Sequence, residues 1–245
     1  MKKSDRIQRL IDELREVKFY DIANSLEDLS DSKDFDSLDR MTFLERLIDP
    51  AYDAKSNRLY VNRLKDGKLS GCPQTIDSCR DSAERVYLPG GIVETLSSLD
   101  FIRQGLNICI LGPSDAGKSY LAKSLGVHAC QKYRAMYQHC EPYLEKMVAL
   151  KETNYAKYQK DLVYAFNLDL LILDDFLLHT ISDEREIKVL HEIMEQRTEH
   201  SRSTIVCSQR EPTSWKSMIL NDEVQANAIM KRAIKHYTIV IQPKC

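Results

Sequence analysis

The chain has 245 residues, of which 43% are hydrophobic and 29% charged, and its net charge is −2. This length allows one large domain or a domain with an appendage, and the composition is that of a globular protein. The near-neutral charge excludes binding that depends on bulk basicity, and no apolar run approaches the roughly 18 residues of a membrane span. The seven cysteines are scattered singly, and no second pair or histidine cluster completes a zinc site beside Cys72 and Cys79, so we expect a cytoplasmic protein without a membrane partner.

The first 50 residues are predicted to be helical. Apolar side chains recur at helical spacing over residues 5–29, which predicts one or two short helices. Another helix is expected over residues 41–48, with Asp39 as its N-cap, and Pro50 lies near its end or kinks it.

Residues 55–68 carry five positive charges against one negative charge, with apolar residues between them. One interpretation is the solvated face of an ordinary helix. The other is a strip that contacts the phosphates of duplex DNA, because five cations on one short element make a local basic surface despite the neutral bulk charge. In this second interpretation the DNA-binding residues are Arg58, Arg63, Lys65 and Lys68.

Two breaks that contain glycine and proline, at 71–73 and 88–91, separate this region from the rest of the chain. We therefore expect an N-terminal helical domain over residues 1–80, which binds DNA or a partner, and a core domain over residues 81–245.

The segment Gly-Pro-Ser-Asp-Ala-Gly-Lys-Ser at 112–119 fits the phosphate-binding loop pattern G-x-x-x-x-G-K-[ST]. An apolar run over 107–111 precedes it with strand length, and apolar residues at helical spacing follow over 120–130. A surface turn that happens to carry Lys-Ser is the alternative, but strand, loop and helix follow in the order that the motif requires. Backbone N–H groups of such a loop cradle a di- or triphosphate, Lys118 reaches the phosphates, and Ser119 binds Mg²⁺. The predicted nucleotide-binding residues are Gly112, Pro113, Ser114, Asp115, Ala116, Gly117, Lys118, Ser119 and Tyr120.

The remaining pattern alternates between strands and helices. Strands are predicted at 133–139, 168–175, 203–209 and 237–241, and helices at 141–150, 155–166, from Asp183 onward, at 211–218 and at 224–234. With the strand before the phosphate loop, this order predicts a parallel five-stranded sheet flanked by helices.

Acidic and polar side chains end two of these strands. Asp174 follows a continuous apolar run, where it is placed to hold the Mg²⁺, and Asp175 is the candidate to polarise the attacking water. The alternative for Asp175 is a helix cap or a surface acid. Ser208 or Gln209 ends the strand expected between the other two, and its polar side chain either positions the γ-phosphate or water or makes only a strand-to-loop hydrogen bond.

Arg232 lies on the predicted helix before the last strand, where it cannot easily reach its own nucleotide. It can instead complete the site of a neighbouring subunit as a charge-stabilising finger, or it is simply solvated. Arg197 and Arg202 are weaker candidates for the same role.

Three segments carry a resemblance to a known family: residues 112–119, Leu-Leu-Ile-Leu-Asp-Asp-Phe at 170–176, and Arg-Ser-Thr-Ile-Val-Cys-Ser-Gln at 202–209. They resemble the IstB family of transposition helper ATPases, which is related to DnaC-type helicase loaders within the AAA+ class. The resemblance runs through residues 41–245, including 42–47 and 57–64. It implies an α/β P-loop NTPase fold of the AAA+ type, with a small N-terminal helical domain and no C-terminal lid.

The resemblance also implies a function. Members form ATP-dependent homo-oligomers that bind and bend DNA and recruit or stimulate a transposase. On this basis Lys118 binds phosphate, Ser119 and Asp174 serve Mg²⁺, Asp175 serves hydrolysis and Arg232 is the finger.

Two departures from the family pattern bear on function. Asp115 stands where the family usually has glycine or a neutral residue, and a carboxylate near a triphosphate is repulsive. The basic strip is also sparser than in typical members. Three alternatives remain beside the transposition helper: a helicase loader, a P-loop kinase of a small metabolite, and a binding module that has lost hydrolysis. Asp115 is the sequence feature that suggests the last of these.

Overall fold

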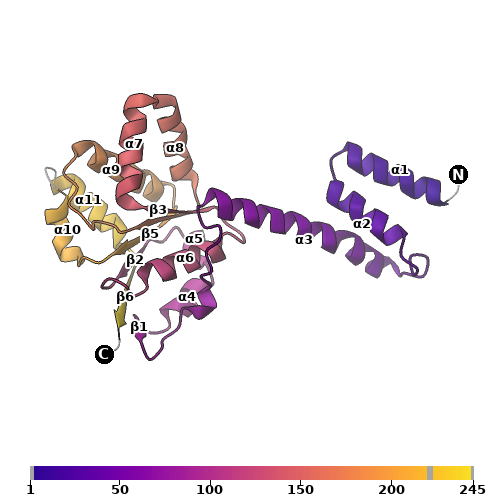
Figure 1. Cartoon of the computed structure of the whole chain (residues 1–245), viewed down its shortest axis with the longest axis horizontal. Coiled ribbons are helices and arrows are strands. Elements are labelled where there is room, and N and C mark those ends of the chain that lie inside the picture. Colours follow the sequence, from indigo (N-terminus) through magenta and orange to yellow (C-terminus); the bar gives the residue numbers. More distant parts are fainter. Residues whose placement is uncertain (1–2, 220–222, 244–245) are drawn as a thin grey trace. The chain divides into compact units, whose positions relative to one another are not determined.

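The computed structural model describes residues 3–219 and 223–243. The chain divides into two compact units, Met1–Asn62 and Arg63–Cys245, each drawn in Figure 1. This division falls earlier than the boundary after residue 80 that we expected from the sequence. The reason is that residues 63–80 pack on the second unit: the carbonyl of Gly67 accepts a hydrogen bond from Tyr137 N at 2.9 Å, and the buried Leu69 lies against Gly126.

The first unit consists of α1 (Lys3–Glu16), α2 (Tyr20–Ser30) and most of α3 (Arg40–Asp66). Its core is formed by Ile11, Ala23 and Leu26, with further apolar side chains of α1 and α3 packed around them. Asp39 caps α3 as predicted, since its Oδ1 accepts hydrogen bonds from the N–H groups of Met41 and Thr42. The helix is 27 residues long and does not end at Pro50, so the basic strip up to Lys65 belongs to it, whereas Lys68 lies beyond its end at Asp66.

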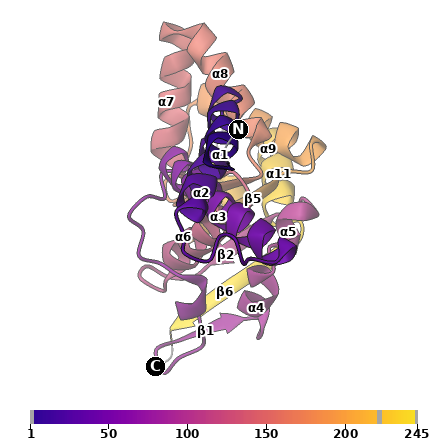
Figure 2. The ribbon, with the colours of Figure 1, turned by 90° about the vertical axis from the view of Figure 1, so that its right-hand side faces the viewer.

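The second unit is built on a six-stranded sheet in the order β1-β6-β2-β5-β4-β3. Its strands are β1 (Arg85–Leu88), β2 (Ile108–Leu111), β3 (Ala135–His139), β4 (Leu170–Asp174), β5 (Ser203–Ser208) and β6 (Tyr237–Pro243). The predicted parallel α/β sheet flanked by helices is confirmed, with a correction from five strands to six. The additional strand is β1, which pairs antiparallel with β6 at one edge of the sheet (Figure 2).

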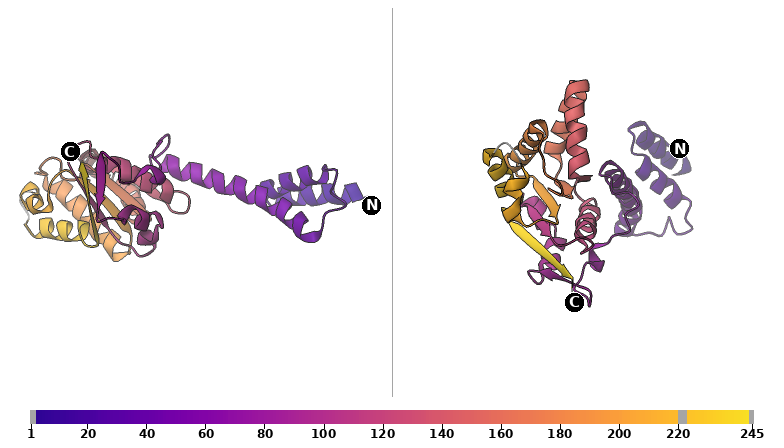
Figure 3. Two further views of the ribbon diagram at one scale, coloured as in Figure 1. Left: turned by 90° about the horizontal axis from the view of Figure 1, so that it is seen from below. Right: turned by 60° about the vertical axis from the view of Figure 1, so that its left-hand side comes forward.

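The helices of this unit are α4 (Ile92–Ser97), α5 (Asp100–Arg103), α6 (Lys118–Ala129), α7 (Cys140–Thr153), α8 (Tyr155–Asn167), α9 (Glu184–Glu199), α10 (Pro212–Met218) and α11 (Glu223–Ala233), and a 3₁₀ turn covers Ile76–Ser78. Of these helices, α6 to α11 follow the predicted order, whereas α4 and α5 before β2 were not predicted. The hairpin of α7 and α8, in red tones, projects beyond the sheet (Figures 1 and 3). No helix in the described parts of the chain is long and apolar enough to cross a bilayer.

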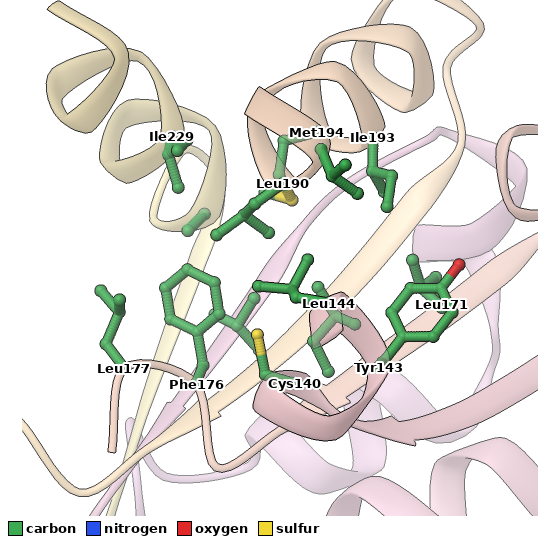
Figure 4. Packing of buried hydrophobic residues seen from close by; sticks show 14 of the residues in the cluster. Cys140, Tyr143, Leu144, Leu171, Phe176, Leu177, Leu190, Ile193, Met194 and Ile229 are labelled. Atoms are coloured by element: carbon green, nitrogen blue, oxygen red, sulfur yellow. The ribbon is translucent and has the colours of Figure 1, made fainter. Parts of the chain in front are cut away.

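Both faces of the central strands are buried, which explains their continuous apolar sequences. Leu171 and Leu173 of β4 point to the main core, where side chains of α7, α9 and α11 meet them (Figure 4). Ile172 points to the opposite face and contacts α6 at Gly126. Because the central strands are parallel, their carboxyl ends share one edge of the sheet, and the segments that follow β2, β3, β4 and β5 meet there.

Candidate nucleotide-binding site

The phosphate loop connects β2 to α6 at this carboxyl edge, and two of its glycines are required by geometry. A Cβ on Gly112 would lie 2.7 Å from the carbonyl oxygen of Ile241, so no side chain fits there. Gly117 has a φ of 103°, which other residues rarely adopt, and it directly precedes α6. Asp115 also has a positive φ, 59°, in a region that aspartate tolerates better than most residues.

Lys118 begins α6 and is buried, with 6% of its surface exposed. Its Nζ donates a hydrogen bond to the carbonyl oxygen of Pro113 at 2.7 Å, which folds the side chain back over the loop. Burial lowers the pKa of Lys118, while Cys207 and the carboxylates of Asp174 and Asp175 act in the opposite direction. A lysine ammonium has three donors, so the bond to Pro113 is compatible with a further bond to a phosphate.

Asp174 ends β4 and is fully buried. Its Oδ2 accepts a hydrogen bond from the hydroxyl of Tyr137, and its Oδ1 accepts one from the backbone N–H of Asp175 at 2.9 Å. Burial, followed by the contact with Asp174, raises the pKa of Tyr137, so the phenol keeps its proton and remains the donor. Each oxygen of the Asp174 carboxylate keeps a second lone pair, so it can accept a hydrogen bond from a water molecule that is bound to Mg²⁺.

Asp175 follows β4 directly, with a φ of 55°. Its Oδ2 lies 2.9 Å from Nδ1 of His139, the last residue of β3. Both side chains are partly exposed at the carboxyl edge of the sheet. Sequence reasoning did not identify His139, although it ends the predicted strand 133–139 and pairs in register with Asp174.

Ser208 ends β5, which lies between β2 and β4 as predicted. The Ser208 side chain is buried, and its Oγ accepts a hydrogen bond from the backbone N–H of Arg210 at 3.1 Å. The strand-to-loop hydrogen bond that the sequence offered as the simpler interpretation is therefore present.

Arg232 lies on α11, near the amino-terminal ends of the parallel strands rather than their carboxyl ends. Its carbonyl oxygen accepts a hydrogen bond from Nδ2 of Asn107, which directly precedes β2, whereas the phosphate loop follows β2. Its guanidinium forms an ion pair with Glu195 of α9 at 3.0 Å. Arg232 is therefore placed away from the phosphate loop of its own chain, and its role as a finger stays a prediction.

The two weaker arginine candidates have structural roles. Arg197 is buried, with 1% of its surface exposed, so its proposed role as a finger is wrong. Its guanidinium donates to the carbonyl oxygens of residues 165, 168 and 203 and to the Thr204 hydroxyl. Arg202 forms an ion pair with Asp169 at 2.6 Å.

The basic strip is largely engaged within the protein. Arg58 pairs with Asp21, and Lys68 donates to Oε1 of Gln138 at 2.6 Å. Arg63 donates to the carbonyl oxygens of Cys130 and Gln131, where it caps the carboxyl end of α6. Lys65 is exposed, and among the described residues no ion pair is recorded for it.

Two further side chains border the loop. Tyr120 follows Ser119 on α6, and its hydroxyl lies 2.7 Å from the Oγ of Ser78. Arg85 of β1 reaches the loop as well: a Cβ on Gly117 would lie 2.4 Å from its Nη1. Sequence reasoning missed Arg85 because it did not predict β1.

Comparisons with known proteins identify the family of the chain. Residues 12–244 match the family model of IstB-like ATP binding proteins. An insertion sequence ATP-binding protein (y4uH) of Sinorhizobium fredii is 30% identical, over 90% of this chain and 87% of its own. The insertion sequence IS232 ATP-binding protein of Bacillus thuringiensis is 27% identical, over 95% of this chain and 91% of its own.

Among solved structures, the DnaC helicase loader superimposes with a TM-score of 0.56 at 16% identity. The similarity covers 70% of this chain and 98% of that one, and it supports the AAA+ type of fold predicted above.

Proposed function

The chain belongs to the family of IstB-like ATP binding proteins, and on that premise we propose that it is a Mg²⁺-dependent ATPase that acts as a transposition helper. In this proposal it assembles on duplex DNA as a homo-oligomer and recruits or stimulates a transposase. The observation that carries the proposal is the shared carboxyl edge of the sheet, where the phosphate loop follows β2, Asp174 ends β4 and Asp175 follows it. The free, mostly buried thiols of the described residues suit the cytoplasmic location expected from the sequence.

The residue roles follow from position and chemistry. Lys118 and the backbone N–H groups of the loop bind the phosphates, and Ser119 and Asp174 hold the Mg²⁺ that accompanies the nucleotide. When bound, this ion neutralises charge on the phosphate oxygens. Asp175 is partly exposed beside His139, so it is the carboxylate that polarises water, and Ser208 borders the same site.

The proposed homo-oligomer rests on Arg232. Arg232 lies near the amino-terminal ends of the parallel strands, away from its own phosphate loop. The transition-state charge that it stabilises is therefore that of ATP bound to a neighbouring subunit. Glu195 holds the Arg232 guanidinium in the single chain, so assembly must exchange this partner for the phosphate of the neighbour.

The DNA-binding part of the proposal rests on the family and on a reduced set of cations. Arg63 caps α6 and Arg58 is paired, which leaves Lys65 as the strip residue best suited to bind a phosphate of DNA. Lys55 is exposed on the same helix and adds to this surface.

A helicase loader is the second candidate function, and the similarity to the DnaC helicase loader favours it. A loader acts mainly on a protein partner, so its ATP turnover does not depend on duplex DNA. The small-metabolite kinase of the sequence analysis is less favoured, because the family match covers residues 12–244.

Steady-state ATP turnover, measured with and without duplex DNA at low salt, tests the proposed function. We expect DNA to stimulate turnover, and we expect Lys65→Gln to weaken DNA binding and to lower the salt slope of log affinity by about 0.9. Lys188→Gln is the matched control, since Lys188 is an exposed lysine of α9 outside the strip. ATP turnover that is the same with and without DNA would favour the helicase loader. A parent protein without ATP turnover would contradict both the transposition helper and the helicase loader.

A further inference from the structure

We propose that Arg85 is a second cationic ligand for the nucleotide phosphates, supplied by the antiparallel edge strand β1. This inference rests on the proposed function, because it concerns the same phosphate loop. It assigns a role to a residue outside the phosphate-loop motif.

The position of Arg85 is the first observation. Its Nη1 lies so close to Gly117 that a single added Cβ there would be 2.4 Å away, so the guanidinium occupies the open face of that glycine. The backbone N–H groups of residues around Gly117 are those that cradle the α- and β-phosphates in such a loop. The guanidinium is therefore next to the place where these phosphates bind.

The second observation is that Arg85 is held in this position. Its backbone is fixed by a turn, in which Ser82 N donates to the Arg85 carbonyl at 2.9 Å, and by pairing of β1 with β6. Its guanidinium lies near the buried Tyr87, and Tyr87 in turn lies near Cys79. Cys79 in turn donates to Ser124 of α6, so this chain of contacts ties Arg85 to the helix that carries Lys118.

The third observation concerns charge. In residues 3–219 and 223–243, no ion pair is recorded between Arg85 and a carboxylate, whereas Arg58, Arg202 and Arg232 all have acidic partners. The planar fork of a guanidinium matches the geometry of carboxylate and phosphate groups. A second cation would also offset Asp115, the carboxylate that makes this loop less favourable for a triphosphate.

Calorimetric titration of the full chain with MgATP and MgADP tests the inference. We expect Arg85→Ala to weaken both affinities by the same factor, about tenfold, because it removes a charge-assisted hydrogen bond to a phosphate that both nucleotides share. Arg85→Lys keeps the charge without the fork, so its affinity falls between those of the parent and Arg85→Ala. Arg103→Ala is the matched control: Arg103 is exposed on α5, before β2, and pairs with Asp100.

The outcomes separate the two proposals. If the parent binds MgATP and Lys118→Ala loses binding while Arg85→Ala binds as well as the parent, only the inference about Arg85 fails. Tighter binding by Arg85→Ala would also overturn it, because Arg85 would then block the site. A parent that binds neither nucleotide would overturn the proposed function and the inference together. Thermal unfolding without nucleotide checks that each variant is folded.

Discussion

Asp175 is the residue on which hydrolysis depends in the proposed mechanism. Its φ of 55° ends the extended conformation of β4, and Nδ1 of His139 lies 2.9 Å from one carboxylate oxygen. Asp174, one position earlier, is buried and bonded by Tyr137. Two adjacent acids thus have different surroundings, one suited to a metal-bound water and the other to the reacting water.

Replacing Asp175 with asparagine should separate binding from hydrolysis. Asn tolerates the positive φ and keeps the size of the side chain, but it has no basicity. We therefore expect Asp175→Asn to bind MgATP like the parent and to turn it over at least about 100-fold more slowly, as calorimetry and phosphate release would show. Asp161→Asn is the control, since Asp161 pairs with Lys146 on the α7–α8 hairpin. Unchanged turnover in Asp175→Asn would assign the base to another residue.

The site could be predicted from the sequence where residues that are adjacent in the chain carry the chemistry. Residues 112–119 and the Asp174-Asp175 pair are local patterns, and the structure places both at one edge of the sheet. His139 and Arg85 could not be found in this way, because each reaches the site through pairing of strands that are distant in sequence. The hydrogen-bond partners of Arg58, Arg63 and Lys68 are also distant in sequence. The sequence therefore did not show that these cations are already bonded within the protein and less available to bind DNA.

At the scale of elements, α9 depends on a buried arginine rather than on a functional one. Arg197 lies in the last turn of this helix and donates to four oxygen atoms on α8, on β5 and in the segment before β4. It therefore ties α9 to α8, to β5 and to the start of β4. The amphipathic pattern predicted α9, but it could not show that a charged residue belongs to its buried face.

Replacing Arg197 with leucine should lower the free energy of unfolding by about 3 kcal/mol, because four acceptors lose their donor within the protein. Chemical denaturation of the parent and the variant measures this difference. Arg185→Leu is the control on the same helix, since Arg185 is exposed and pairs with Asp183 and Glu152, and it should change stability little. An Arg197→Leu variant as stable as the parent would show that the buried hydrogen bonds contribute nothing net.

The elements that sequence reasoning missed or ended too early share a physical cause. β1 has four residues directly before a Pro-Gly-Gly turn, so it looked like part of a break, and only its pairing with β6 makes it a strand. α3 continues through Pro50 because a proline removes a single N–H donor, and flanking residues of good helix propensity keep the helix intact. In both cases contacts or residues outside the local pattern decided the structure.

At the scale of the whole molecule, the division between Asn62 and Arg63 falls inside α3. Sequence breaks at 71–73 and 88–91 suggested a later boundary, but a helix can cross between units without any change in composition. The second unit includes residues 63–80, with Leu69 against α6 and Gly67 beside β3. The sequence pattern of residues 63–80 does not show that these residues contact α6 and β3.

The central claim is that ATP is hydrolysed in an assembly, at the phosphate loop of one subunit and with Arg232 of the next. Arg232→Ala should bind MgATP normally and hydrolyse it slowly, since it lacks the charge that stabilises the transition state. Lys118→Ala should fail to bind MgATP but still supply an intact Arg232. For the parent, turnover per subunit should rise with protein concentration.

Mixing these two variants is the most direct measurement. In the mixture, some interfaces combine an intact Lys118 with an intact Arg232, so we predict that ATP turnover recovers to a measurable fraction of the parent value although each variant alone is nearly inactive. Size-exclusion chromatography of the mixture establishes that the variants assemble together. If co-assembled mixtures stay as inactive as the separate variants, or if the dilute parent hydrolyses ATP as a monomer, the assembly mechanism is contradicted.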